Sequence, residues 1–138
     1  MLNPDNPKHA AADRRLRQET VIWLTTVNKA GQPQSSPVWF LWDGVAFLIY
    51  GSADGGKTRN IDSNPRVGLH LDANGEGGGI VIFEGTATVD RQGPPAHTVA
   101  NYMAKYQRRI ESYGWTIESF EKDYPHVIRV TPARARIW

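Results

Sequence analysis

The chain has 138 residues, the length of one ordinary domain, and its 40% hydrophobic and 22% charged residues allow a buried core. Sixteen lysines and arginines against fourteen acidic residues leave a net charge of +2, too even a balance to indicate a nucleic-acid or membrane-surface binder. The chain has no cysteine, which excludes disulfides, thiolate zinc sites, iron–sulfur clusters and cysteine nucleophiles, and fits a cytoplasmic protein.

The composition of the chain changes at Thr20, from polar and charged residues to β-branched and aromatic ones. Residues 1–18 are polar and charged, so we expect no secretory signal there, only a loose arm followed by a short helix over residues 10–17. The apolar runs elsewhere are far shorter than the roughly 20 residues that a membrane-spanning helix needs. We therefore expect an N-terminal arm, residues 1–18, and one domain over residues 19–138.

Three strands are expected directly after the arm. The residues there are rich in β-branched and aromatic types, and polar turns interrupt them. Asp43-Gly44 stands between two apolar runs and predicts a hairpin with a type I′ turn, in which both central residues have positive φ. The strands are expected at residues 21–27, 34–42 and 45–50, as a three-stranded antiparallel meander.

The second half of the chain mixes strands with helices. Residues 80–91 alternate between apolar and polar types as a half-buried strand does, and Gly85 within them indicates a bend or a close approach of two backbones. An apolar stripe at helical spacing predicts one substantial helix that begins at Pro94 or Pro95 and packs on the core through Val99, Tyr102, Met103, Tyr106 and Ile110. The other expected elements are short helices at 57–63 and 115–122, strands at 66–72 and 126–138, and a bulge or break at Pro132.

These elements add up to a mainly β protein of about six strands, arranged as a small barrel or sandwich. Within it, residues 51–58 match the phosphate-loop pattern GxxxxGK(S/T) between an expected strand and an expected helix. We reject a nucleoside triphosphatase, because the preceding strand already belongs to a hairpin and Pro65 cuts the helix short. The chain also has too few βα units for a parallel nucleotide-binding sheet.

The same segment still predicts an anion site. Its glycines let backbone N–H groups approach an anion, and the helix start adds partial positive charge. Lys57, Arg59 and Arg66 supply full charges, and the hydroxyls of Ser52 and Thr58 supply hydrogen bonds. We therefore interpret the segment as a phosphate seat, against the alternative of a turn whose basic residues only face water.

Residues 25–40, Thr-Thr-Val-Asn-Lys-Ala-Gly-Gln-Pro-Gln-Ser-Ser-Pro-Val-Trp-Phe, resemble the first hairpin of the split-barrel flavin and deazaflavin oxidoreductases. These are the pyridoxamine 5′-phosphate oxidase-like proteins, and the chain resembles their actinobacterial branch, which uses the deazaflavin coenzyme F420. The likeness runs from about residue 21 to residue 138. It continues through residues 57–61, 64–67, 84–87 and 132–138.

This resemblance implies a six-stranded antiparallel split β-barrel, the Greek-key fold of FMN-binding split barrels, with one substantial helix and short flanking helices. It also implies a homodimer with one cofactor per subunit in the interface groove. The stretch from Ser36 to Trp39 would lie beside the flat ring, and Lys57 to Asn60 would hold the cofactor phosphate. The cofactor-binding residues carried over in this way are Ser36, Pro37, Val38, Trp39, Tyr50, Ser52, Lys57, Thr58, Arg59 and Asn60.

The implied function is an F420-dependent oxidoreductase that transfers a hydride between the reduced cofactor and a small conjugated or quinone-like acceptor. FMN is the alternative cofactor, and a non-catalytic module that binds or stores a cofactor is the alternative role. No side chain has a clear claim to be the proton donor. We expect no nucleic-acid or membrane partner, because the charge balance indicates neither, and the tryptophans lie mostly in strand patterns that favour core or dimer packing over base stacking.

Histidine spacing gives no sign of a metal site. None of the four histidines forms an HxH or HExxH pattern, and we expect no bound metal. Some barrels related to this family bind haem, so a single axial histidine stays open as an alternative. The four candidates are His9, His70, His97 and His126.

Overall fold

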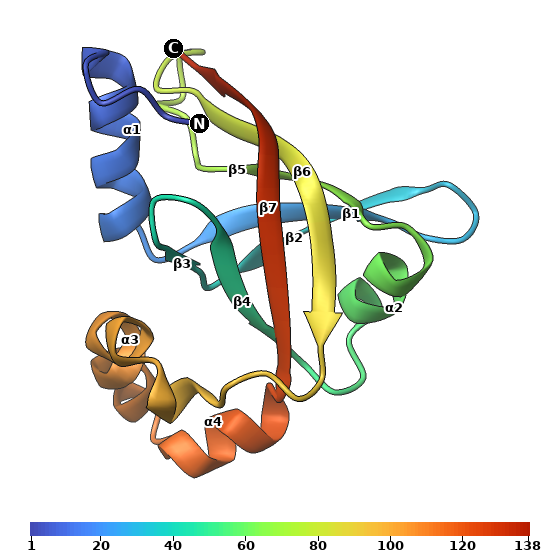
Figure 1. Cartoon of the computed structure of the whole chain (residues 1–138). Helices are drawn as coiled ribbons and strands as arrows, with labels where there is room; N and C mark the ends of the chain where they lie inside the picture. The colour runs from blue at the N-terminus through green and yellow to red at the C-terminus, as the bar shows by residue number, and fades with distance from the viewer.

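A computed structural model describes all 138 residues and has one antiparallel sheet at its centre, with strand order β2-β1-β5-β6-β7-β4-β3 (Figure 1). The strands are β1 (Ile22–Val27), β2 (Pro33–Val38), β3 (Leu41–Trp42), β4 (Phe47–Gly51), β5 (Arg66–His70), β6 (Val81–Asp90) and β7 (His126–Ile137). The helices are α1 (Pro7–Gln18), α2 (Gly56–Ser63), α3 (Ala100–Ser112) and α4 (Ile117–Asp123), with a short 3₁₀ turn at Ala96–Thr98. None of these helices has the length and apolar character that crossing a bilayer requires.

The two edge strands of the sheet, β2 and β3, are neighbours in the sequence. Only Trp39 and Phe40 separate them, although five other strands lie between them in the sheet. A flat sheet would hold its edges much farther apart than two residues can span. The sheet therefore curls until its edges approach one another, which gives the half-barrel in Figure 1 and confirms the expected split-barrel class.

Two details of the expected first meander are wrong. The segment expected as one strand over residues 34–42 breaks at Trp39 and Phe40, which raises the strand count from six to seven. After this break the chain has moved to the far edge of the sheet, so β4 pairs with β3 and β7 and makes no pairing with β2. The structure thus contains two separate hairpins in place of a three-stranded meander.

The Asp43-Gly44 hairpin is present, but its turn is not of type I′. No residue other than glycine has a positive φ, and only Gly44, at +94°, adopts the left-handed region here. The Asp43 carboxylate instead accepts hydrogen bonds from the backbone N–H groups of Val45 and Ala46, both at 2.8 Å. This side-chain cap stabilises the turn without requiring positive φ at aspartate.

The long pair β6–β7 carries the bulge expected near Pro132. Glu84 pairs with Arg134 and Gly85 with Pro132, so Ala133 is the extra residue on β7. The Thr131 carbonyl lies where a side chain at Gly85 would be. The glycine therefore permits the two backbones to approach closely at this point, as its place in the alternating strand indicated.

Apolar side chains form two clusters on opposite faces of β4, because alternate residues of this strand belong to each cluster. The larger cluster of 17 buried residues fills the half-barrel, and α1 contributes Leu16 and Ala12 to it, so the expected short helix is present and packed. The Trp42 indole donates to Asp13 of α1 at 2.9 Å, which ties this helix to β3. The smaller cluster of eight joins α3 and α4 to β4, and Figure 1 shows these two helices together near the start of β7.

Candidate functional site

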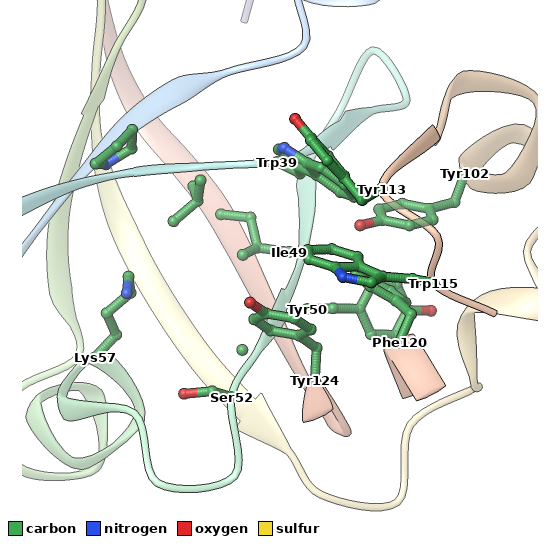
Figure 2. Close-up of a pocket in the computed structure, with 13 residues that line it drawn as sticks. Trp39, Ile49, Tyr50, Ser52, Lys57, Tyr102, Tyr113, Trp115, Phe120 and Tyr124 are labelled. Atoms are coloured by element: carbon green, nitrogen blue, oxygen red, sulfur yellow. The ribbon is translucent and has the colours of Figure 1, made fainter. Parts of the chain in front are cut away.

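A cavity of about 340 Å³ lies between the smaller cluster and the start of α2. This is within the range of small-molecule sites, and aromatic side chains make up much of its wall (Figure 2). Of the ten residues carried over from the resemblance, the cavity brings together six: Pro37, Val38, Trp39, Tyr50, Ser52 and Lys57. The other lining residues, which the sequence analysis did not assign to a site, are Ile49, Gly51, Tyr102, Tyr113, Trp115, Phe120 and Tyr124.

One end of the cavity is suited to an anion. Helix α2 begins at Gly56, and no side chain caps it, so its first N–H groups have no intrahelical acceptor. Lys57 and Ser52, both half-buried, line the cavity beside this helix start. Gly55 donates to the Ser52 carbonyl at 3.1 Å, and a Cβ at Gly55 would come within 2.7 Å of the Ser52 hydroxyl oxygen. A cation, a hydroxyl and the positive end of a helix therefore converge here.

Thr58 and Arg59 lie in the same helix but outside the cavity wall. Thr58 is 2% exposed, and its hydroxyl donates to the Gly55 carbonyl at 2.8 Å. The Arg59 guanidinium donates to the Asp54 carbonyl at 2.9 Å. Both side chains thus hold the loop before α2 in shape, and their direct contact with a cofactor phosphate stays a prediction.

Asn60 and Ser36 are also outside the wall. The Asn60 amide donates to the Thr26 hydroxyl at 3.0 Å and to the Gln34 side chain at 2.9 Å, so it fastens α2 to β1 and β2. Ser36 is half-buried on β2, one residue before the part of the strand that lines the cavity. Their assignment to the cofactor likewise stays a prediction.

The other end of the cavity is an aromatic stack built on Trp39. The Trp39 ring lies parallel to Tyr106, with centroids 4.8 Å apart and planes at 8°, and it stacks on Phe120 at 5.9 Å. Tyr113 and Trp115 extend this stack outwards, and they are 55% and 41% exposed. Figure 2 shows these rings gathered on the side of the cavity away from Lys57. The wall therefore offers flat apolar faces on which a planar ring can stack.

Helix α3 holds Trp39 in place through the backbone of Phe40. The Phe40 N–H donates to the Tyr106 hydroxyl at 2.8 Å, and the Phe40 carbonyl accepts from Lys105 Nζ at 2.8 Å. The Tyr106 hydroxyl can in turn donate to the carbonyl of Thr20 at 2.8 Å or of Phe40 at 3.0 Å. Because Phe40 has left the sheet, these contacts replace its strand pairing. They fix the position at which Trp39 enters the cavity wall.

Lys105 should make folding stability depend on pH. Burial lowers the pKa of Lys105 to about 8, while its ammonium lies 3.8 Å from the centre of the Phe40 ring. Between about pH 8 and 10 the unfolded chain keeps a proton that the folded chain has released, so the free energy of unfolding rises with pH. We expect a rise on the order of 1 kcal/mol relative to Lys105→Met, because the ammonium keeps partial contact with water.

Urea denaturation of both proteins at pH 7.5, 8.5 and 9.5 measures this difference. Lys122→Met is the matched control, because Lys122 is exposed on α4. The free energy of unfolding of this variant should depend on pH in the same way as that of the wild type. If the free energy of unfolding changed equally with pH in the wild type and in Lys105→Met, the expected pKa shift would be contradicted.

No metal centre accompanies the cavity. The structure has no group of three or more histidine, aspartate or glutamate side chains placed to hold a metal ion. None of the four histidines lines the cavity, so this chain supplies no axial histidine to a haem there.

A family model and a curated relative both point to the same protein family. The family model described as pyridoxamine 5′-phosphate oxidase matches residues 9–138. A curated relative, the pyridoxine/pyridoxamine 5′-phosphate oxidase of Edwardsiella ictaluri, is 32% identical over 62 residues. That alignment covers 44% of this chain and 29% of the relative, so the chain matches less than a third of the relative's length.

Solved structures share the fold at low sequence identity. A conserved hypothetical protein of Mycobacterium tuberculosis is 21% identical with a TM-score of 0.70, over 94% of this chain and 82% of that one. An F420 reductase is 23% identical with a TM-score of 0.65, over 90% and 94%. A haem storage protein of Vibrio cholerae is 18% identical with a TM-score of 0.63, over 92% of both chains. At these identities the likeness shows the fold alone.

Proposed function

The chain belongs to the pyridoxamine 5′-phosphate oxidase family, and from this premise we propose that it is an oxidoreductase dependent on coenzyme F420. Its acceptor would be a small conjugated or quinone-like molecule. The observation that carries the proposal is the cavity itself, in which an anion seat at Lys57 and a stack of aromatic rings share one space. A flat ring system with a phosphate-bearing side chain matches both ends at once.

The residues of this chain have separate tasks in that proposal. Lys57, Ser52 and the start of α2 would bind the phosphoryl group. Pro37 and Val38 would lie along the ring, where Pro37 has no N–H group that could be left without a partner. The aromatic walls would exclude water from the reacting face. When bound, a deazaflavin supplies two-electron hydride chemistry, which these residues orient.

FMN is the second candidate cofactor, since the same anion seat suits a flavin phosphate. The F420 reductase among the fold neighbours supports the deazaflavin, and the haem storage protein among them supports a storage role for the fold. The cavity favours a flavin or deazaflavin over haem, because no histidine reaches it. We further propose a homodimer whose interface completes the groove. The half-exposed rings of Tyr113 and Trp115 at the cavity support this proposal.

Side-by-side titration of the purified chain with F420 and FMN, followed by calorimetry or cofactor fluorescence, tests the proposal. We expect F420 to bind more tightly, and anaerobic addition of a quinone to oxidise the reduced cofactor. Tighter binding of FMN would favour the second candidate. Binding without any turnover of acceptors would indicate a storage module, and absence of binding by both cofactors would overturn the proposal.

A further inference from the structure

Tyr102 is a buried tyrosine whose hydroxyl has no partner in the protein. The residue is 1% exposed and lines the cavity from α3. Its two tyrosine neighbours are satisfied by the backbone: the Tyr50 hydroxyl donates to the Pro94 carbonyl at 2.8 Å, and the Tyr106 hydroxyl is bound to Phe40. Figure 2 shows the Tyr102 hydroxyl pointing from α3 towards the other side chains of the cavity.

The hydroxyl oxygen itself opens into the cavity, because the one fully buried side-chain polar atom without a hydrogen-bond partner is His126 Nδ1. The rings packed around Tyr102 supply no hydrogen-bond partner for this hydroxyl. Its ring lies edge-on to Tyr50 at 4.9 Å, tilted against Tyr106 at 4.8 Å, and 6.2 Å from Phe120. Its acceptor must therefore be water in the cavity or a bound molecule that replaces this water.

The chemistry of that molecule follows from the surroundings of the hydroxyl. Burial raises the pKa of Tyr102 well above its usual value, so the group stays protonated and acts as a donor at physiological pH. Lys57 is the only cationic side chain in the cavity wall, and Figure 2 shows it on the far side from Tyr102. A donor among neutral aromatic rings suits an uncharged oxygen and does not suit a second anion.

We propose that the Tyr102 hydroxyl donates a hydrogen bond to the carbonyl oxygen of the acceptor, and so selects neutral conjugated ketones and quinones over phosphorylated substrates and hydrocarbons. This rests on the proposed function for the presence of an acceptor beside the cofactor. A site that hydrogen-bonds a substrate oxygen discriminates against analogues that lack this oxygen. Tyr102 would thus determine specificity without holding the cofactor.

The test compares two probes that share one ring skeleton, 1-tetralone and its hydrocarbon tetralin. Dissociation constants are measured by ligand-detected NMR on wild type, Tyr102→Phe and Tyr106→Phe, with and without bound cofactor. We expect the wild type to prefer the ketone by about fivefold to tenfold, the effect of one neutral hydrogen bond. Tyr102→Phe should bind both probes equally, with an unchanged melting temperature, because it removes an oxygen that has no protein partner.

Tyr106→Phe is the matched control, because it removes a phenol oxygen one helical turn away that the backbone already holds. It should lower stability and, through the position of Trp39, the affinity for both probes alike, so that the ratio of ketone to hydrocarbon affinity stays as in the wild type. A wild-type ratio near one, or an equal ratio in Tyr102→Phe and wild type, would overturn the proposal. Cofactor affinity is read in the same samples, so failure of F420 and FMN to bind counts against the proposed function separately.

Discussion

Replacing Gly85 with alanine is expected to lower the free energy of unfolding by about 3 kcal/mol or more. A Cβ at this position would meet the Thr131 carbonyl group and come 2.9 Å from Pro132 Cα. All of these atoms belong to the backbone of β7, and no side-chain rotation can move them aside. The β6–β7 pair would have to separate at its bulge, in the longest strand pairing of the half-barrel.

Gly68→Ala is the matched control for this effect. Gly68 lies on the neighbouring strand β5 and pairs with Glu84, but a Cβ there would meet nothing closer than the Phe83 carbonyl oxygen at 3.8 Å. Its stability should stay within about 0.5 kcal/mol of the wild type, since alanine also reduces the freedom of the unfolded chain. Urea denaturation measures both variants. A Gly85→Ala protein as stable as Gly68→Ala would show that the bulge tolerates a side chain.

Replacing Lys57 with alanine is expected to weaken binding of the phosphate-bearing cofactor by about 1.5–3 kcal/mol, the range for hydrogen bonds to charged groups. Lys57 is the only residue in the cavity wall with a full positive charge, and it lies at the uncapped start of α2. Removing it leaves the helix N-terminus and Ser52 to bind the anion. Calorimetric titration with F420 and with FMN gives the two affinities.

Two other basic residues sharpen this experiment. Arg59 follows two positions later, but its guanidinium bonds to the Asp54 carbonyl, so Arg59→Ala should cost less affinity than Lys57→Ala. Lys29 is exposed in the β1–β2 turn, and Lys29→Ala should leave the affinity unchanged while altering the net charge equally. Equal losses in Lys57→Ala and Lys29→Ala would point to a general effect of charge and remove Lys57 from the binding site.

Local patterns were enough to predict most of the elements, because their causes are local. The alternation of apolar and polar residues around Gly85 arises within one strand that has one buried face. The apolar residues at helical spacing that include Tyr106 arise within one helix. The break at Trp39 and Phe40 could not be predicted in this way. The hydrogen bonds that make it possible come from Tyr106 and Lys105, which are 66 and 65 residues further along the chain than Phe40.

The candidate site also has one part that could be predicted from local sequence and one part that could not. The anion seat lies within eight consecutive residues, so glycine, lysine and helix start could be recognised together. The aromatic end assembles from separate elements, and its members on α3 and α4 carry the spacing of ordinary core residues. Tyr102 shows the difficulty: its apolar ring does pack in the core, as expected, while its hydroxyl reaches the cavity. Only the positions of its neighbours reveal that the oxygen has no partner.

The two-residue passage through Trp39 and Phe40 couples closure of the half-barrel to occupation of the cavity. Moving the outer strands apart would strain this passage and pull the indole away from its place above Tyr106. A bound molecule that rests on the indole therefore opposes that movement, by the usual linkage between ligand binding and stability. Any movement that displaces the Trp39 ring from the cavity wall therefore also separates the edge strands of the half-barrel.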